Sequence, residues 1–152
     1  MLGRVGEKLL GGKMHLDVAA ARKAIEEKLA VKLNMTVEEV ADVKTAVSEA
    51  VTNAIIHGYE SRIEKITLRC KTCGDTLYIE IEDHGKGMED VKKAMEPLFT
   101  TRPELDRSGM GFSFMEAFMD QVEVSSKPGK GTIVKMQKTI GKGRKVWTTQ
   151  SL

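Results

Sequence analysis

The chain has 152 residues and a mass of 16.8 kDa, a size that suits one domain with a single core. Hydrophobic residues make up 41% and charged residues 30%, as in ordinary soluble proteins, and a net charge of +2 is too small to indicate a nucleic-acid or membrane surface. No apolar run approaches the roughly 20 residues that cross a bilayer, residues 1–13 lack the features of a secretory signal, and two cysteines cannot staple a disulfide-rich fold. We therefore expect a cytoplasmic protein.

The N-terminal part of the chain predicts a leader, a short strand and a helix. Residues 1–13 are Gly-rich and basic without a clear period, which indicates a mobile leader or an expression remnant. A short edge strand is expected over 14–18. A helix is expected over 19–33, with one apolar face made of Ala21, Ile25, Leu29 and Leu33. A new helix should start next, because Thr36 can act as its N-cap and Glu39 can complete a capping box.

The longest periodic stretch, Asp42 to Tyr59, predicts an amphipathic helix. Its apolar stripe consists of Val43, Ala46, Val47, Ala50, Val51, Ala54 and Ile55. Its polar face, at four-residue spacing, consists of Thr45, Glu49, Asn53 and His57. Gly58 stands where a helix C-terminus favours a residue that tolerates positive φ. A carboxylate and a carboxamide one turn apart could hold a hard cation against a phosphate, although this helix alone favours the alternative of a solvated polar face.

The second half of the chain predicts two hairpins with helices between them. Strands over 65–71 and 76–82 alternate apolar and polar residues, and Gly74 and Asp75 serve as turn residues between them. The remaining expected elements are a short helix over 90–95, a mobile loop over 98–108, a helix over 110–119, strands over 121–126 and 130–138, and an unplaced basic tail over 141–152. This order favours an α+β fold with a mixed, mostly antiparallel sheet and helices on one face.

Two glycine motifs could bind a nucleotide. Asp83-His-Gly85-Lys-Gly87 directly follows a predicted strand, where an aspartate can accept a hydrogen bond from an exocyclic amine and glycines let a flat ring approach the backbone. Ser108-Gly109-Met-Gly111 opens a helix, so its N–H groups and the helix N-terminus suit phosphate oxygens. A simple turn and a glycine-rich helix start are the respective alternatives. The chain has neither a dinucleotide fingerprint nor a Walker-type loop.

The two cysteines and two of the histidines do not indicate a metal or catalytic site. Cys70 and Cys73 form a C-x-x-C pair, but zinc usually needs four ligands and no second pair exists, so we interpret them as two small hairpin residues. We expect His57 to be a structural hydrogen-bonding residue at a helix end and His84 to face solvent.

The order of three motifs resembles that of the GHKL ATP-binding superfamily. The motifs are Glu49 with Asn53 on a helix, then Asp83-x-Gly-x-Gly, then a loop ending in Gly-x-Gly. Within it, residues 47–60 (VSEAVTNAIIHGYE) and 97–112 (PLFTTRPELDRSGMGF) are similar to the anti-sigma F family of sporulation kinases. The resemblance covers about 14–140. It implies the GHKL (Bergerat) two-layer α/β sandwich, whereas the leader and the tail match nothing in that family.

The resemblance implies a protein serine/threonine kinase that uses ATP or ADP and Mg²⁺. Glu49 would be the general base for a substrate serine, Asn53 would ligate Mg²⁺, and Asp83 would recognise adenine. Further nucleotide contacts would come from Gly85, Gly87, Thr100, Thr101, Arg107, Ser108, Gly109, Gly111 and Thr132. Residues 98–111 would form a lid over the nucleotide.

The same resemblance implies the partners. The protein would be a homodimer that sequesters a sporulation sigma factor, sigma F, and phosphorylates an anti-anti-sigma protein on serine, with no direct contact to nucleic acid or membrane. Arg22 would help to dock partners, and Arg107 would face a partner or the γ-phosphate. Two alternatives remain, a sigma-binding module that transfers no phosphate and the sibling general-stress anti-sigma kinase. The intact Glu49 disfavours the first, and the lid sequence disfavours the second.

Overall fold

The computed structural model describes residues 17–59, 65–96 and 111–141. The helical elements are α2 (Val18–Ala24), the π-helical segment η1 (Ile25–Leu29), α3 (Val37–Asn53), the π-helical segment η2 (Ala54–Gly58), α4 (Val91–Ala94) and α5 (Gly111–Phe118). The strands are β1 (Thr67–Cys73), β2 (Thr76–Asp83), β3 (Gln121–Lys127) and β4 (Gly131–Thr139). None of the described helices is long and apolar enough to cross a membrane.

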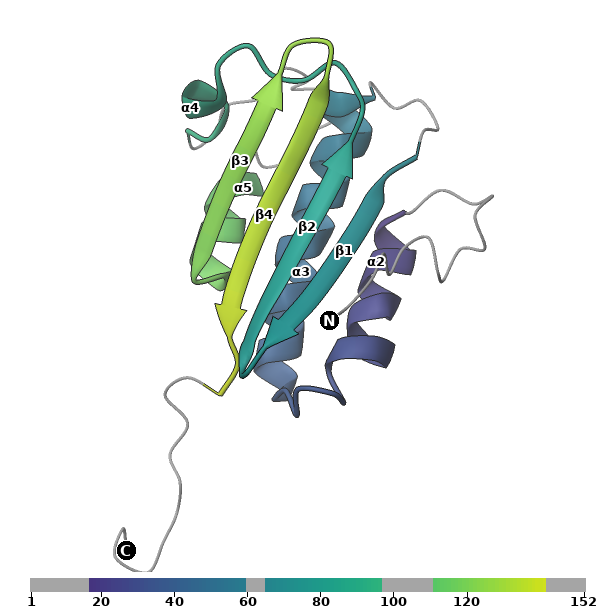
Figure 1. Cartoon of the computed structure of the whole chain (residues 1–152), viewed down its shortest axis with the longest axis vertical. Coiled ribbons are helices and arrows are strands. Elements are labelled where there is room, and N and C mark those ends of the chain that lie inside the picture. Colours follow the sequence, from purple (N-terminus) through teal and green to yellow (C-terminus); the bar gives the residue numbers. More distant parts are fainter. Residues whose placement is uncertain (1–16, 60–64, 97–110, 142–152) are drawn as a thin grey trace, which may run out of the picture.

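The four described strands form one antiparallel sheet in the order β1-β2-β4-β3 (Figure 1). β1 and β2 join through Gly74 and Asp75, and Gly74 has the positive φ of 60° that the predicted turn requires. β2 ends opposite the start of β4, with Asp83 aligned to Thr132. The predicted strands and the α+β class are confirmed, and the described part of the sheet is antiparallel throughout rather than mixed.

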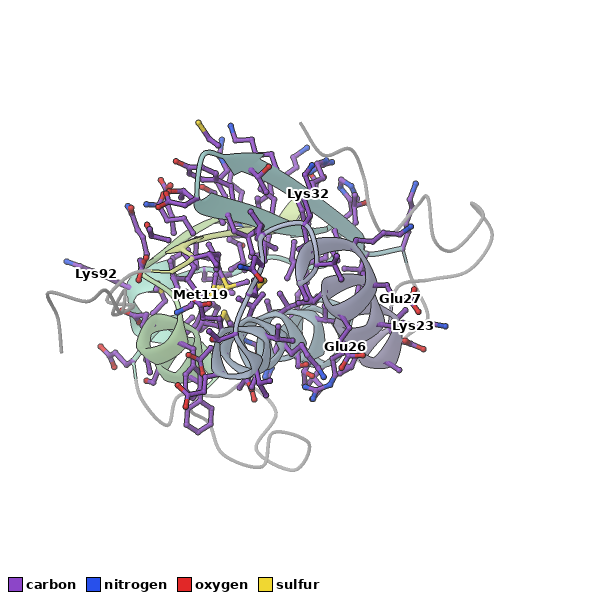
Figure 2. The ribbon with its side chains drawn as sticks, turned by 90° about the horizontal axis from the view of Figure 1, so that it is seen from below. Lys23, Glu26, Glu27, Lys32, Lys92 and Met119 are labelled. Carbon is purple, nitrogen blue, oxygen red and sulfur yellow. The ribbon has the colours of Figure 1, made fainter. Side chains whose placement is uncertain are left out.

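The helices α2, α3 and α5 lie on one face of the sheet, as predicted (Figure 1). The predicted stripe of α3 is buried there, from Val43 to Ala54, while Ile55 is only partly buried. It faces alternate residues of β2, among them Leu77, Ile79 and Ile81, each at most 2% exposed. Each fully buried aliphatic side chain contributes about 1.5–3 kcal/mol, so this two-layer core is the main source of stability. Figure 2 shows Met119 between the layers.

The start of α3 is tied down by the predicted capping box. Thr36 Oγ1 accepts the Glu39 N–H at 3.1 Å, and the Thr36 N–H donates to Glu39 Oε1 at 2.9 Å. The second oxygen of Glu39 accepts the N–H of Gly141, 102 residues away, at 2.6 Å. One side chain thus anchors both the start of α3 and the chain just after β4.

The first helix confirms its predicted face but not its start. Ala21, Ile25 and Leu29 are fully buried, and the α-helical turns give way to η1 after Ala24. The predicted strand over 14–18 is wrong where the structure describes it. Asp17 is an N-cap whose Oδ1 accepts the Ala20 N–H at 2.7 Å, and the helix begins at the next residue. Residues 14–16 lie outside the described residues.

The expected role of Gly58 is also wrong. Its φ is not positive, because the helix continues through η2, of which Gly58 is the last residue, and Tyr59 is the C-cap. Glycine is needed there for space, since a Cβ at position 58 would lie 2.9 Å from Asp83 Oδ1. The leader over 1–13, the loop over 98–108 and the tail beyond 141 lie outside the described residues.

Candidate functional site

A pocket of about 620 Å³ opens between α3, the end of β2 and the start of β4. Its apolar lining includes Ala50, Ala54, Ile81, Phe112 and Val134, and its polar lining includes Asn53, His57, Asp83, Lys86, Lys93 and Thr132. This volume lies in the usual range for small-molecule sites, and a lining that combines apolar surface with polar groups suits a flat heteroaromatic ring.

Asp83 is the buried acid of this pocket. Only 5% of it is exposed, and it is the one carboxylate among the described residues that is buried. Its Oδ1 accepts the Gly85 N–H at 2.9 Å. Burial raises the pKa of this carboxyl, and the backbone N–H groups of Gly85 and Thr132 oppose that rise. A buried carboxylate disfavours folding, so its place in a pocket indicates a binding role.

The glycines after Asp83 allow two close backbone contacts. A Cβ on Gly85 would lie 2.1 Å from the Gly58 carbonyl oxygen, and one on Gly87, whose φ is +72°, would lie 2.0 Å from that of Lys127. The Gly58 carbonyl also accepts the Lys86 N–H at 2.9 Å. The loop is thus held between the end of η2 and the β3–β4 turn. Gly87 lines the pocket, whereas Gly85 lies against the helix end.

Two hydroxyl groups that sequence reasoning missed support this loop. Tyr59, 4% exposed, donates to the Lys65 carbonyl at 2.7 Å and accepts the His84 N–H at 2.6 Å. Ser126 Oγ accepts the Met88 N–H at 2.8 Å. Nothing in the sequence marks Tyr59 beyond its position after the helix. Ser126 could have been found, because the predicted hairpin pairs it with Thr132.

The predicted acid and amide of α3 both reach the start of α5. Asn53 lines the pocket, and Glu49 lies one turn earlier, half-buried beside it. A Cβ on Gly111 would lie 3.1 Å from Asn53 Nδ2 and 3.3 Å from Glu49 Oε2. The lack of a side chain at Gly111 therefore lets the α5 N-terminus, with its partial positive charge, approach both groups. His57 lines the same pocket one turn further along the helix.

In the described part of the chain no group of three or more His, Cys, Asp or Glu side chains could hold a metal ion. Asn53 offers an amide oxygen, a ligand type that Mg²⁺ accepts, and Mg²⁺ commonly completes its coordination with phosphate oxygens and water. A site with one protein ligand beside a helix N-terminus, which suits phosphate oxygens, therefore fits this metal.

Several predicted residues lie elsewhere. Thr100, Thr101, Arg107, Ser108 and Gly109 lie outside the described residues. Arg22 lies on the exposed side of α2, and its Nη1 donates to Ser48 Oγ at 3.0 Å, next to Glu49 in the chain.

The cysteine pair is divided between two environments. Cys73 is exposed at the end of β1, as a hairpin residue should be, and His84 is exposed as predicted. Cys70 instead faces the core within β1, where burial raises the pKa of its thiol to about 12. Both cysteines lie in the β1–β2 hairpin, as predicted, but only Cys73 is exposed.

Comparison with known proteins identifies the family. Residues 15–138 match the family described as the histidine kinase-like ATPase domain. The anti-sigma F factor of Thermoanaerobacter sp. (strain X514) is 60% identical over 112 residues, which cover 74% of this chain and 78% of that protein. The chain belongs to the anti-sigma F factor family. The anti-sigma F factor of Clostridium perfringens (strain SM101 / Type A) is 47% identical over 139 residues, 86% of this chain and 99% of its own.

Solved structures agree on the fold of this anti-sigma F family member. The RsbU and RsbW domains of Rv1364c from Mycobacterium tuberculosis match with a TM-score of 0.60 at 19% identity, over 86% of this chain and 31% of theirs. The Acinetobacter baumannii histidine kinase AdeS matches with a TM-score of 0.51 at 17% identity, over 67% of this chain and 47% of its own. The predicted family and GHKL fold class are confirmed, and the protein is an anti-sigma factor of the GHKL kinase type, whose ATPase domain implies nucleotide binding.

Proposed function

We propose that this protein binds Mg·ATP in the pocket beside Asp83, sequesters sigma F, and phosphorylates an anti-anti-sigma protein on serine. The observation that carries the proposal is the buried Asp83 carboxylate in a 620 Å³ pocket that Asn53 also lines, with Glu49 one turn away. The buried acceptor Asp83 suits a nucleotide base. The N-terminus of α5, beside Asn53 and Glu49, suits a phosphate chain.

The base would lie at the Asp83 end. Its ring would contact the apolar lining, including Ile81 and Val134, and its exocyclic amine would donate to the Asp83 carboxylate. Thr132, 7% exposed and aligned with Asp83 across two strands, supplies a second polar group there. Gly87 lines this part of the pocket without a side chain in the way of the ring.

The phosphates would extend towards α5, where the Gly111 end of the helix carries partial positive charge. Bound Mg²⁺ would neutralise charge on the phosphate oxygens, and Asn53 would supply its protein ligand. Glu49 would orient the substrate serine and take its hydroxyl proton. The serine oxygen then bonds to the γ-phosphorus while the bond to the β–γ bridging oxygen breaks, and ADP leaves.

The partner roles rest on the family. The curated relatives carry the name anti-sigma F factor, so we assign sigma F as the bound sigma factor, with the anti-anti-sigma protein as the serine substrate. We place the kinase domain at 14–140 of a cytoplasmic homodimer and keep Arg22 as a docking residue. Thr100, Thr101, Arg107, Ser108 and Gly109 stay predicted contacts of a lid over 98–111.

A binding module without phosphoryl transfer is the competing function. It would use the same pocket and the same sigma factor, but it has no need of a carboxylate next to the metal ligand. The position of Glu49 beside Asn53 and the α5 N-terminus favours the kinase.

The two functions differ in one product. The protein is incubated with Mg²⁺, ATP labelled on the γ-phosphate and an anti-anti-sigma protein, and the partner is analysed for phosphoserine. We expect labelled phosphoserine in the presence of Mg²⁺ and none in EDTA. Nucleotide-dependent sigma F binding without any transfer would establish the binding module instead. Preferential binding of a general-stress sigma factor over sigma F would show instead that the protein has the partner of the sibling general-stress kinase.

A further inference from the structure

Ser126, the second-last residue of β3, contacts three polar groups next to the pocket. Its Oγ lies 2.8 Å from the Met88 backbone nitrogen, 3.0 Å from the Gly131 carbonyl oxygen and 2.8 Å from Thr132 Oγ1. Ser126 is not part of the pocket lining, whereas Thr132 and Met88 are. The serine therefore acts on the pocket only through its neighbours.

The protons of these groups can be assigned by counting. A hydroxyl has one proton to donate and two lone pairs to accept with. The Met88 N–H can only donate, and the Gly131 carbonyl can only accept. For all three contacts to be hydrogen bonds, Ser126 must donate to Gly131 and accept from both Met88 and Thr132. This arrangement uses the full capacity of the serine hydroxyl and directs the Thr132 proton away from the pocket.

The consequence falls on the polar end of the pocket. With its proton committed to Ser126, Thr132 presents only lone pairs to a ligand. Asp83, its partner across β2 and β4, presents carboxylate oxygens, of which Oδ1 already accepts the Gly85 N–H. Asp83 and Thr132 therefore both offer acceptors, and a ligand that contacts them must bring donors.

We propose that Ser126 is a specificity-determining residue, which holds Thr132 as an acceptor so that the pocket takes a purine with an exocyclic amine and rejects one with a carbonyl at that position. The proposal deepens the proposed function and rests on it. A carbonyl that faced Asp83 and Thr132 would meet two acceptors and gain no hydrogen bond from either, which is the situation that makes polar sites selective. Ser126 is a positioning residue, since it would not touch the base.

The test compares ATP with inosine triphosphate, which has a carbonyl in place of the amine. Dissociation constants for both are measured by calorimetry for the parent and for Ser126→Ala, on the parental and on a Thr132→Val background. We expect the parent to prefer ATP. Ser126→Ala frees the Thr132 proton to point into the pocket and serve the carbonyl, so the ATP preference should fall about three- to tenfold, the range for one neutral hydrogen bond.

Two further variants keep the test sharp. Ser126→Thr retains the hydroxyl and should restore the parental preference. Ser126→Cys conserves volume but is a poor acceptor, so it should lower the preference even if the alanine variant is unstable. On the Thr132→Val background, Ser126→Ala should leave the ratio of the dissociation constants for ATP and inosine triphosphate unchanged, because valine has no hydroxyl proton that the loss of Ser126 could free.

Three results would overturn the proposal. An unchanged preference in a folded Ser126→Ala variant that binds ATP would show that the serine does not set specificity. An equal change on the Thr132→Val background would trace the effect to the Met88 loop instead of Thr132. A parent that binds neither nucleotide would remove the proposed function itself, and this inference with it.

Discussion

The substitution Asp83→Asn tests the proposed adenine site with little change of shape. An asparagine can place its amide oxygen where Oδ1 accepts the Gly85 N–H at 2.9 Å, so the loop keeps its support. The other carboxylate oxygen becomes an NH₂ group, which donates. An exocyclic amine that met an acceptor in the parent would then meet a second donor. The variant should therefore fold and lose base recognition.

The magnitude follows from the type of hydrogen bond. A hydrogen bond to a charged group contributes about 1.5–3 kcal/mol, which corresponds to roughly a tenfold to 150-fold weaker ATP affinity. Stability should change in the other direction or not at all. Burial raises the pKa of Asp83 in the folded state, so above that pKa the ionised carboxylate disfavours folding. Asparagine removes this penalty at neutral pH.

The raised pKa also predicts two pH dependences. As pH rises through the folded-state pKa of Asp83, the carboxylate forms and ATP affinity increases. Over the window between the unfolded and the folded pKa, the unfolded chain has already lost its proton, so the stability contribution of Asp83 falls as pH rises. Asp83→Asn should remove both dependences. ATP itself also titrates, so the affinities of parent and variant are compared at each pH, and the contribution of ATP then cancels.

Calorimetric titration with ATP and thermal unfolding, each run at several pH values, measure these effects. Asp75→Asn, at the exposed turn between β1 and β2, is the matched control and should behave as the parent does. Unchanged ATP affinity in a folded Asp83→Asn variant would refute the assignment of Asp83 to the base.

Four other changes should have distinct results. Asn53→Ala should weaken Mg·ATP binding and phosphoryl transfer together, and equal loss of affinity in EDTA would contradict a metal role. Gly58→Ala should lower ATP affinity and change the melting temperature little, because the new Cβ would lie 2.9 Å from Asp83 Oδ1 and displace the pocket carboxylate. An ATP affinity equal to that of the parent would show that residue 58 does not position Asp83. Tyr59→Phe should cost about 1–3 kcal/mol in the free energy of unfolding, measured in urea, because the two backbone groups that its hydroxyl bridges lose a partner; a loss below 0.5 kcal/mol would count against the bridge. Ellman's reagent should modify Cys73 quickly and Cys70 only after unfolding, since the buried thiol has a pKa of about 12; two fast equivalents in the native protein would show that Cys70 is accessible.

Local patterns account for the parts of the fold that could be predicted. The 3.6-residue period of α3 and the alternation in β2 each report one buried face, and Thr36 with Glu39 forms a cap within four residues. Such signals need no knowledge of the rest of the chain. The same holds for Gly74, whose turn connects two adjacent strands.

Contacts between distant residues account for what could not be predicted. Gly58 suggested a left-handed helix end by its position alone, but its real constraint is the Asp83 carboxylate, 25 residues later. Asp17 looked like part of a strand because its capping bond is visible only when the helix start is known. The order of motifs predicted Asn53, Asp83, Gly87 and Thr132, which all line the pocket, whereas Ser126 lies outside the lining and could be found only through its pairing with Thr132 across the hairpin.

The proposed kinase activity would depend on Glu49, and the comparison of Glu49→Gln with the parent tests this proposal most directly. Glutamine keeps the shape of the side chain and removes the carboxylate, so ATP binding and sigma F binding should stay within about twofold, while the rate of phosphoserine formation on the anti-anti-sigma protein should fall by about 10²–10⁴. Glu38→Gln, an exposed change in the first turn of the same helix, should leave all three measurements at parental values. A Glu49→Gln variant that phosphorylates as fast as the parent would contradict the account.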